Sequence, residues 1–403
     1  MNNALTAYFR QRIDPLSPLQ EERSALVISS RIVDGEPIVI SRYRDDVWRI
    51  LNQPTNKPPS EQAINFYRLP RAFQETMKAI TYRYLQRGRE GQKRPGPRAV
   101  VKLVRDAGPF LRYLEKRSIA KLANATAEIC AGYVEACRRH RVSTSDGSKP
   151  MAVQALVHRF ASVEALHELS QYTQDRMPEY PWPETSAAHL AGRTGPGTGL
   201  RKGGTPLMPD EVFTRLFQRA SSIVESGASL LDVRDTWLIM EAERGQNWDY
   251  GTKCYELGCF VKSRGWRSAG DFNKALYELR TACYIIAASL SGCRNHELAF
   301  VQTGACYSTT SKIADREDDV QTFWWMRSQS TKTGADHTEW MIPKAAATAL
   351  KVMERWASPY QQQIATEIDM RRARDRNDPE IAEALRHQAA LFLAAEHRRG
   401  NQV

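Results

Sequence analysis

A segment rich in proline and glycine, MPEYPWPETSAAHLAGRTGPGTGLRKGGTPLMP at residues 177–209, interrupts a chain that otherwise carries regular hydrophobic patterns. This composition continues neither a helix nor a strand and is typical of a linker. A chain of 403 residues is long enough for two or three separate cores. We therefore expect an N-terminal extension of mixed structure at 1–60, a helical domain at 61–185, a linker at 186–205 and a second domain at 206–403.

Helical periodicity dominates both expected domains. Between about residues 66 and 180, apolar residues recur every three or four positions, as in RAVVKLVRDAGPFLRYLEKRSI. This spacing predicts four or five helices packed as a small bundle with a basic outer surface. Strand-like runs are short: one pair flanks Asp34-Gly35 and another flanks the turn TGAD, and each pair predicts a β-hairpin. The predicted fold class is mainly α with a small β-sheet or hairpin.

The positive charge of the chain is concentrated in one segment. Residues 61–205 carry 24 basic and 13 acidic side chains, a balance of +11, whereas residues 1–60 carry 8 and 7 (+1) and residues 206–403 carry 25 and 26 (−1). A basic excess of this size favours a polyanionic partner such as a nucleic acid. The helical domain is therefore the expected DNA-binding part of the chain.

The densest basic strip is ITYRYLQRGREGQKRPGPR, and two further basic residues end the linker. The expected DNA-contacting residues are Arg83, Arg87, Arg89, Lys93, Arg94, Arg98, Arg201 and Lys202. The alternative interpretation is structural, because a loop between helices and a tether between domains are often basic only to stay solvated.

Several functional classes are disfavoured by the sequence. No apolar run approaches the ~18 residues that cross a bilayer, and the N-terminus lacks the apolar core of a signal peptide. The seven cysteines stand in apolar surroundings, which favours reduced thiols over a disulfide framework. Cys254 and Cys259 come closest to the spacing of metal ligands, but no second pair completes a site. We expect neither a metal nor a cofactor.

An arginine and a glutamate stand three residues apart in SGCRNHELAF, directly after the almost uncharged run ACYIIAASL. Arg294 has the planar, permanently charged group that binds phosphate oxygens in pairs, and Glu297 could orient it. Lys332 falls at the tip side of the second hairpin, where a basic neighbourhood can lower its pKa and suit it to proton donation. The alternative is structural, since an Arg-x-x-Glu pair on a helix surface is worth roughly a few tenths of a kcal/mol.

The order of these motifs resembles the tyrosine site-specific recombinase, or phage integrase, family. SLSGCRNHELAFV is similar to the family's small-Gly-x-Arg-x-x-Glu-Leu box, STKTG to its lysine hairpin, and WMIPKAAATALKVMERW to its Ile/Val-Pro segment and next helix. PLMPDEVFTRLFQ resembles the entry to the catalytic domain, and the basic helices before it resemble the core-binding, SAM-like bundle. The resemblance runs from about residue 66 onward. It is most specific at SGCRNHEL, residues 291–298, which we call the arginine box.

The resemblance implies a cofactor-free reaction on DNA. A tyrosine attacks the scissile phosphodiester, forms a 3′-phosphotyrosyl link and frees a 5′-hydroxyl, and the strand is then joined to a different partner. Arg294 would stabilise the charge on the non-bridging oxygens, with Glu297 in support, and Lys332 would protonate the departing 5′-oxygen. The implied partners are double-stranded DNA, further copies in a tetrameric synapse and other recombinase subunits, with no membrane, in the bacterial cytoplasm on the nucleoid.

The segment after the lysine hairpin departs from the family pattern, which places a His-x-x-Arg box, a further His or Trp and the nucleophilic Tyr there. The best local match is EALRHQAALFL, where Arg386 and His387 stand at the positions of the second arginine and its companion but Glu383 replaces the first histidine. The last tyrosine, Tyr360, precedes this match and is not the expected nucleophile.

Three explanations for the departure stay open. The chain stops inside the catalytic domain, or the match at 383–387 is accidental with an insertion before the true box, or the protein has lost cleavage and kept binding. We favour the first, so that the domain at 206–403 is expected to be incomplete. The predicted function is a DNA recombinase or integrase of a mobile element. The alternatives are a non-catalytic, recombinase-like DNA-binding partner or regulator and, more weakly, a helical protein that binds RNA or an acidic protein.

Overall fold

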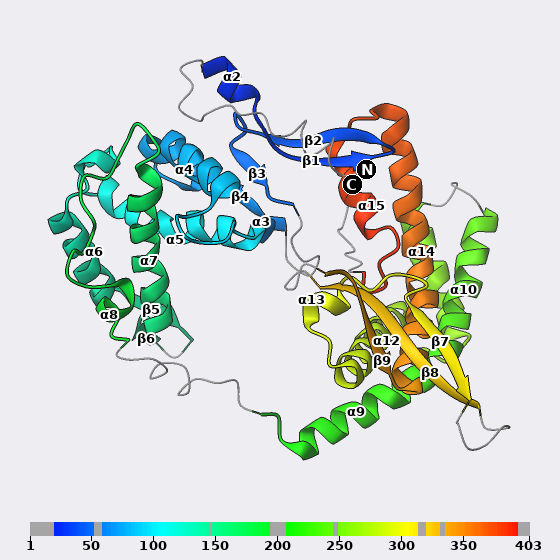
Figure 1. The fold of residues 1–403 in the computed structure, drawn as a ribbon. Coiled ribbons are helices and arrows are strands. Elements are labelled where there is room, and N and C mark those ends of the chain that lie inside the picture. Colours follow the sequence, from blue (N-terminus) through cyan, green and yellow to red (C-terminus); the bar gives the residue numbers. More distant parts are fainter. Residues whose placement is uncertain are drawn as a thin grey trace. The chain divides into compact units, whose positions relative to one another are not determined.

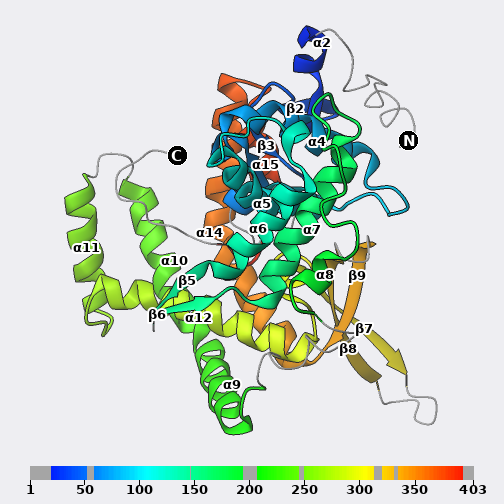
Figure 2. The same ribbon diagram turned by 90° about the vertical axis from the view of Figure 1, so that its left-hand side faces the viewer.

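The computed structural model divides the chain into two compact units (Figures 1 and 2). Unit 1 comprises Met1–Gln53 and Lys57–Pro206, and unit 2 comprises Pro54–Asn56 and Leu207–Val403. The structure describes residues 20–51, 59–145, 147–193, 207–244, 249–312, 320–330 and 335–393. The described elements are mostly helices with small antiparallel sheets, which confirms the prediction of a mainly α fold with a small β component.

Unit 1 begins with short strands and continues as helices. Its elements are α2 (Gln20–Ala25), β1 (Val27–Val33), β2 (Glu36–Arg42), β3 (Val47–Arg49), α3 (Pro59–Gln62), β4 (Ala63–Asn65), α4 (Gln74–Arg87), α5 (Pro97–Glu115), α6 (Ala127–Arg139), β5 (Arg141–Thr144), β6 (Gly147–Pro150), α7 (Val153–Ser170) and α8 (Ala187–Leu190). Strands β1 and β2 pair antiparallel across Asp34 and Gly35, which both have positive φ, +53° and +88°. Two such residues make the tight turn that suits a twisted hairpin, so the predicted first hairpin is confirmed.

The early strands share one core with the helices of unit 1. Trp48 on β3 is fully buried, and its ring lies 4.8 Å from that of Phe66 in a near-perpendicular arrangement. Lys78 on α4 is 3% exposed and binds the Asp46 carboxylate at 3.0 Å. A buried lysine must be paired to remain charged, so this contact fixes α4 against the strand region. The segment we expected as an extension of mixed structure thus packs into the helical unit.

Unit 2 is a helical layer with one three-stranded sheet. Its elements are α9 (Asp210–Glu225), α10 (Gly227–Arg244), α11 (Tyr250–Lys262), α12 (Ala269–Ser291), α13 (Asn295–Leu298), β7 (Cys306–Lys312), β8 (Val320–Ser330), β9 (Ala335–Ile342), α14 (Lys344–Arg374) and α15 (Pro379–His387). The core is formed where α12 packs on α9 and α14, around residues such as Leu279, Leu350 and Trp356.

The sheet of unit 2 has the antiparallel order β7-β8-β9. The register of β8 and β9 runs from Trp324 opposite Ile342 to Ser330 opposite Ala335, which confirms the predicted second hairpin. Strand β7 was not predicted, because the polar run CYSTTSK lacks the alternation of a half-buried strand. Lys332 lies between the two paired strands, in a part of the chain outside the described residues.

The charged segment near the C-terminus is helical, as the sequence indicated. Helix α14 runs for 31 residues with Pro359 inside it, and α15 follows after a short turn. Within the described ranges, every helix is too short or too polar to cross a lipid bilayer.

Candidate functional site

The arginine box lies at the junction between α12 and α13. Helix α12 ends at Ser291 and is followed by Gly292, whose left-handed backbone (φ +66°) reverses the chain without the steric cost that a side chain would bring. Arg294 then takes an extended conformation as the residue that precedes α13. The glycine of the motif therefore has a local physical reason, because it lets the chain turn from the long helix α12 into the short helix α13, which starts at Asn295 directly after Arg294.

Glu297 is the centre of the box and is 2% exposed. Its carboxylate accepts hydrogen bonds from the Arg294 amide, the Arg294 Nη1 and the Ser330 hydroxyl, each at 2.8 Å. Burial by itself would raise the pKa of Glu297, but the bonds from the Arg294 amide, the Ser330 hydroxyl and the Arg294 guanidinium outweigh it and hold that pKa below its ordinary value. Glu297 is therefore an ionised, buried anchor.

The Arg294 guanidinium binds the Glu297 carboxylate with one nitrogen, while about half of the side chain remains exposed to solvent. It is 53% exposed, while the carboxylate it binds is almost fully buried. This asymmetry separates the pair from the ordinary surface Arg-x-x-Glu pair, in which both groups are solvated. A guanidinium fixed by a buried carboxylate keeps its remaining N–H groups in a defined direction, as recognition of an anion requires.

Strand β8 joins the hairpin to the box. Ser328 and Ser330 stand two residues apart on one face of the strand, and their hydroxyls donate to the Glu297 carbonyl and carboxylate respectively. Lys332 follows Ser330 by two residues and is outside the described part of the chain. Neither serine was predicted, although their period-2 spacing just before the lysine is a signal that they share a face.

Helix α15 and the segment that follows it lie close to the arginine box. Arg386 is 16% exposed, lies over the ring of Phe300 at 5.5 Å and is 3.6 Å from the Glu383 carboxylate. The chain beyond it pairs with the strand-like stretch after α13, because Leu391 N donates to Val301 O at 3.0 Å. The structure thus brings the neighbourhoods of Arg386 and Arg294 together.

His387 forms a contact of its own helix rather than of the arginine box. Its Nε2 lies 3.2 Å from the Glu383 carboxylate, four residues earlier on α15. Glu383 therefore contacts both Arg386 and His387, the two residues of this helix that the sequence singled out.

Two further residues beside the box were not predicted. The Tyr284 hydroxyl on α12 donates a hydrogen bond of 2.5 Å to Oδ1 of Asn295, the residue that follows Arg294 in the sequence. The His296 ring lies with Nε2 3.9 Å from the Glu297 carboxylate. Tyr360, by contrast, packs against Trp356 with the two tilted rings 4.8 Å apart, and burial raises the pKa of its phenol.

Three residues of the basic strip in unit 1 are engaged within the protein. Arg83 lies over the Tyr172 ring at 4.1 Å, Arg89 binds Glu168 at 2.6 Å, and Arg94 donates to the Leu85 carbonyl at 2.9 Å.

The other members of the strip, Arg87, Lys93 and Arg98, are exposed at the end of α4, in the following loop and at the start of α5. No ion pair joins these three to another side chain within the described residues. Arg201 and Lys202 fall outside the part of the chain that the structure describes.

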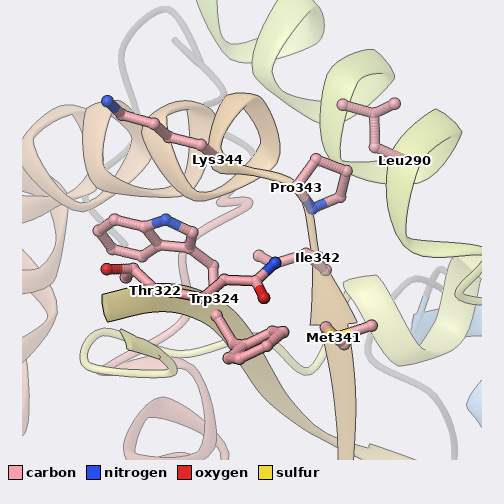
Figure 3. A pocket seen from close by; sticks show the side chains of 9 residues that line it. Leu290, Thr322, Trp324, Met341, Ile342, Pro343 and Lys344 are labelled. Atoms are coloured by element: carbon pink, nitrogen blue, oxygen red, sulfur yellow. The ribbon is translucent and has the colours of Figure 1, made fainter. Parts of the chain in front are cut away.

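A hollow of about 720 Å³ lies in unit 2 between the sheet, the end of α12 and the start of α14 (Figure 3). Trp324, Ile342, Pro343 and Lys344 are among the residues that line it. Trp324 belongs to the paired rung of β8 and β9 that is farthest from Ser330, so most of the hollow lies at the other end of this strand pair. Leu290, near the end of α12, is the lining residue that comes nearest to Arg294 in the sequence.

The described residues contain no cluster of three His, Cys, Asp or Glu side chains that could hold a metal ion. Comparison with models of known protein families, with curated proteins and with solved structures finds no match to this chain.

Proposed function

We propose that the chain is a DNA-binding protein of the recombinase type, which breaks and rejoins DNA of a mobile element through a 3′-phosphotyrosyl intermediate. Arg294 binds the scissile phosphate, Glu297 positions Arg294, and Lys332 acts as the general acid on the departing 5′-oxygen. Such chemistry depends on positioning and on electrostatic stabilisation more than on any resident cofactor.

The observation that carries this proposal is the buried Glu297 carboxylate. It binds the half-exposed Arg294 guanidinium and, at the same distance of 2.8 Å, the Ser330 hydroxyl on the strand that leads to Lys332. A surface charge pair has no need of a buried carboxylate or of a second element held to it. The arrangement supports a site in which an arginine and a hairpin lysine act on one phosphate.

Unit 1 supports the DNA-binding half of the proposal. Arg87, Lys93 and Arg98 are exposed cations on neighbouring elements and form no ion pair within the described residues. They are suited to contact successive phosphates, with an affinity that falls as salt rises. The partners in this proposal are duplex DNA, further copies on that DNA in a tetrameric assembly and other recombinase subunits, on the nucleoid of a bacterial cell.

A second candidate function is a recombinase-like protein that binds DNA without cutting it. The observation that favours it is the state of Tyr360, the last tyrosine of the sequence, which precedes the match to the second arginine box and is packed against Trp356 with a pKa that burial raises. In this case Arg294 would hold a phosphate without any reaction following.

One experiment separates these proposals. The full chain, and the same chain continued by any coding sequence that follows Val403, are incubated with nicked suicide duplexes drawn from the DNA flanking the gene, and both covalent complexes and salt-dependent affinity are measured. A covalent complex with either chain supports a recombinase, and Arg294→Ala should abolish it while affinity changes little. A binder without chemistry gives no covalent complex with either chain. Arg87→Ala/Lys93→Ala/Arg98→Ala should flatten the slope of log affinity against log salt by about 2 to 3.

The matched control is Lys262→Ala/Arg267→Ala/Arg376→Ala, which removes the same charge from exposed positions of unit 2. It should leave the salt slope near that of the unaltered chain. Equal slopes for the two triple variants would contradict the proposed DNA-binding surface, and a salt-independent affinity of the unaltered chain would contradict DNA binding itself.

A further inference from the structure

Strands β5 and β6 form a hairpin that stands outside the core of unit 1, between the end of α6 and the start of α7 (Figures 1 and 2). They pair antiparallel from Arg141 opposite Pro150 to Thr144 opposite Gly147. The two strands contact each other far more than any other element, and their described side chains are exposed on both faces of the pair. A lone pair of strands gains little stability in water, so burial of apolar surface does not account for this hairpin.

The two faces of the β5–β6 hairpin differ in chemistry. The register and the alternation of side chains along a strand place Arg141, Ser143 and Ser148 on one face. Val142 and Lys149 lie opposite each other on the other face. The first face thus presents a guanidinium and two hydroxyls, which are groups that form hydrogen bonds with base edges. Arg141 and Lys149 are exposed, and neither forms an ion pair within the described residues.

The helix that leads into the hairpin adds an exposed cation at its base. Arg139, in the last turn of α6, has a side chain that is 83% exposed and lies 4.0 Å from the Glu135 carboxylate. Its neighbour Arg138 is engaged within the protein, because it donates to the Leu190 carbonyl at 2.8 Å and binds Glu135 at 3.0 Å. Residues 138–150 carry four basic side chains and one acidic one, so this end of unit 1 complements a polyanion.

Duplex DNA is the polyanion whose shape suits the hairpin. Its major groove, ~12 Å wide and ~8.5 Å deep, admits a two-stranded β-ribbon, and side chains on the inward face of the ribbon reach the base edges. Duplex RNA is a poorer fit, because side chains cannot read its deep, narrow major groove. Arg139 belongs to the helix and not to the ribbon, so a hairpin seated in the groove would leave this side chain at the edge, beside the phosphates.

We infer that the β5–β6 hairpin reads base edges in the major groove, with Arg141 on a guanine, and that Arg139 binds a flanking phosphate. The inference rests on the DNA binding of the proposed function and adds the element that selects a sequence. It assigns different tasks to two arginines that stand two positions apart, and these tasks have different experimental signatures. A base contact changes sequence preference, whereas a phosphate contact changes the dependence of affinity on salt.

Binding of the full chain to a pool of short duplexes of random sequence tests the inference. Sequencing of the bound fraction gives the base preference at each position, and titration gives the slope of log affinity against log salt. Arg141→Ala should lower the preference for guanine at one position at least about fivefold, and Ser143→Ala/Ser148→Ala should weaken the preference at adjacent positions. Arg139→Ala should leave every preference unchanged and flatten the salt slope by about 1.

The matched control is Lys116→Ala, which removes a charge from an exposed position of unit 1 outside the hairpin and should leave the base preferences unchanged. Circular dichroism melting of every variant separates a local effect from loss of the fold. If the unaltered chain binds the duplexes and Arg141→Ala keeps its base preferences, or if the unaltered chain has none, the inference fails while the proposed DNA binding stands. If the unaltered chain shows no salt-dependent affinity for the duplexes, the proposed function fails and the inference fails with it.

Discussion

The behaviour of single residues in this protein depends on burial more than on residue type. Glu297 and Glu339 each bind an arginine at 2.8 Å, yet the Glu297 side chain is 3% exposed and that of Glu339 is 45% exposed. Removing the hydrogen-bond partners of a buried carboxylate costs far more free energy than removing those of an exposed one, because water cannot replace them. The Arg294–Glu297 pair should therefore contribute more to the free energy of unfolding than the Arg327–Glu339 pair between β8 and β9.

Glu297→Gln should lower the free energy of unfolding at pH 7 by about 1 to 3 kcal/mol, because the amide cannot accept all three bonds. The pKa of Glu297 is lowered in the folded chain. The stabilising contribution of Glu297 is therefore present above the unfolded pKa of about 4.3 and is lost as pH falls through the folded pKa. Because glutamine does not titrate, the free energy of unfolding of the variant should fall less steeply with pH in the acid range.

Urea unfolding between pH 3 and 7 measures both effects. Glu339→Gln is the matched control and should change stability by less than about 0.5 kcal/mol. If the two substitutions cost the same, Glu297 is not the buried anchor described above.

At the scale of elements, a buried arginine allows a proline inside a long helix. Pro359 has no amide hydrogen, so within α14 the carbonyl of Arg355, four residues earlier, lacks its helical partner. Arg234 on α10 is 6% exposed and donates to the carbonyls of Arg355 and Trp356, each at 2.8 Å. This contact between distant elements keeps the helix continuous and ties α10 to it.

Arg234→Met should lower the free energy of unfolding by about 2 to 4 kcal/mol, since the partly buried Arg355 carbonyl and the buried Trp356 carbonyl would both lose this donor. Adding Pro359→Ala should recover at least about 1 kcal/mol, because the new amide can bond to that carbonyl. Equilibrium denaturation of the two single variants and the double variant measures the coupling. Arg376→Met, at an exposed position, is the control, and additive effects of the two changes would contradict the capping role.

At the scale of the whole molecule, the boundary of the first unit is set by its core. Trp48 on β3 and Tyr43 in the turn after β2 pack into the same cluster as Phe66 and the helices that follow. A helical unit without these strands would expose that surface and lose the partner of Lys78. Folding of the helices in unit 1 therefore depends on residues that precede them in the sequence.

A fragment of residues 1–206 should unfold cooperatively and should give a near-ultraviolet circular dichroism signal from its buried aromatic residues. A fragment of residues 61–206 should show neither the cooperative transition nor the signal. The physical reason is the loss of Trp48, which is fully buried and is among the largest side chains in the core. Thermal melting of the two fragments is the measurement. A cooperative transition in the shorter fragment at the same temperature would show that the strands are dispensable.

The sequence predicted those features that depend on local chemistry. The Asp34-Gly35 turn, the β8–β9 hairpin and the helical content follow from residue conformations and from the spacing of apolar residues, which act over a few positions. Strand β7 was missed because its polar residues carry no hydrophobic alternation, and its pairing with β8 is a tertiary event.

For the candidate site, the sequence by itself determined that Arg294 and Glu297 stand together at the end of an apolar helix, because three-residue spacing and a glycine suffice for that. Only the tertiary structure decided that Glu297 is buried, that Ser330 reaches it from the hairpin, and that the segment after Arg386 returns to pair beside Val301. It also decided which cations of the basic strip are exposed. Burial and pairing between distant segments depend on how whole elements pack, and no spacing along the chain specifies them.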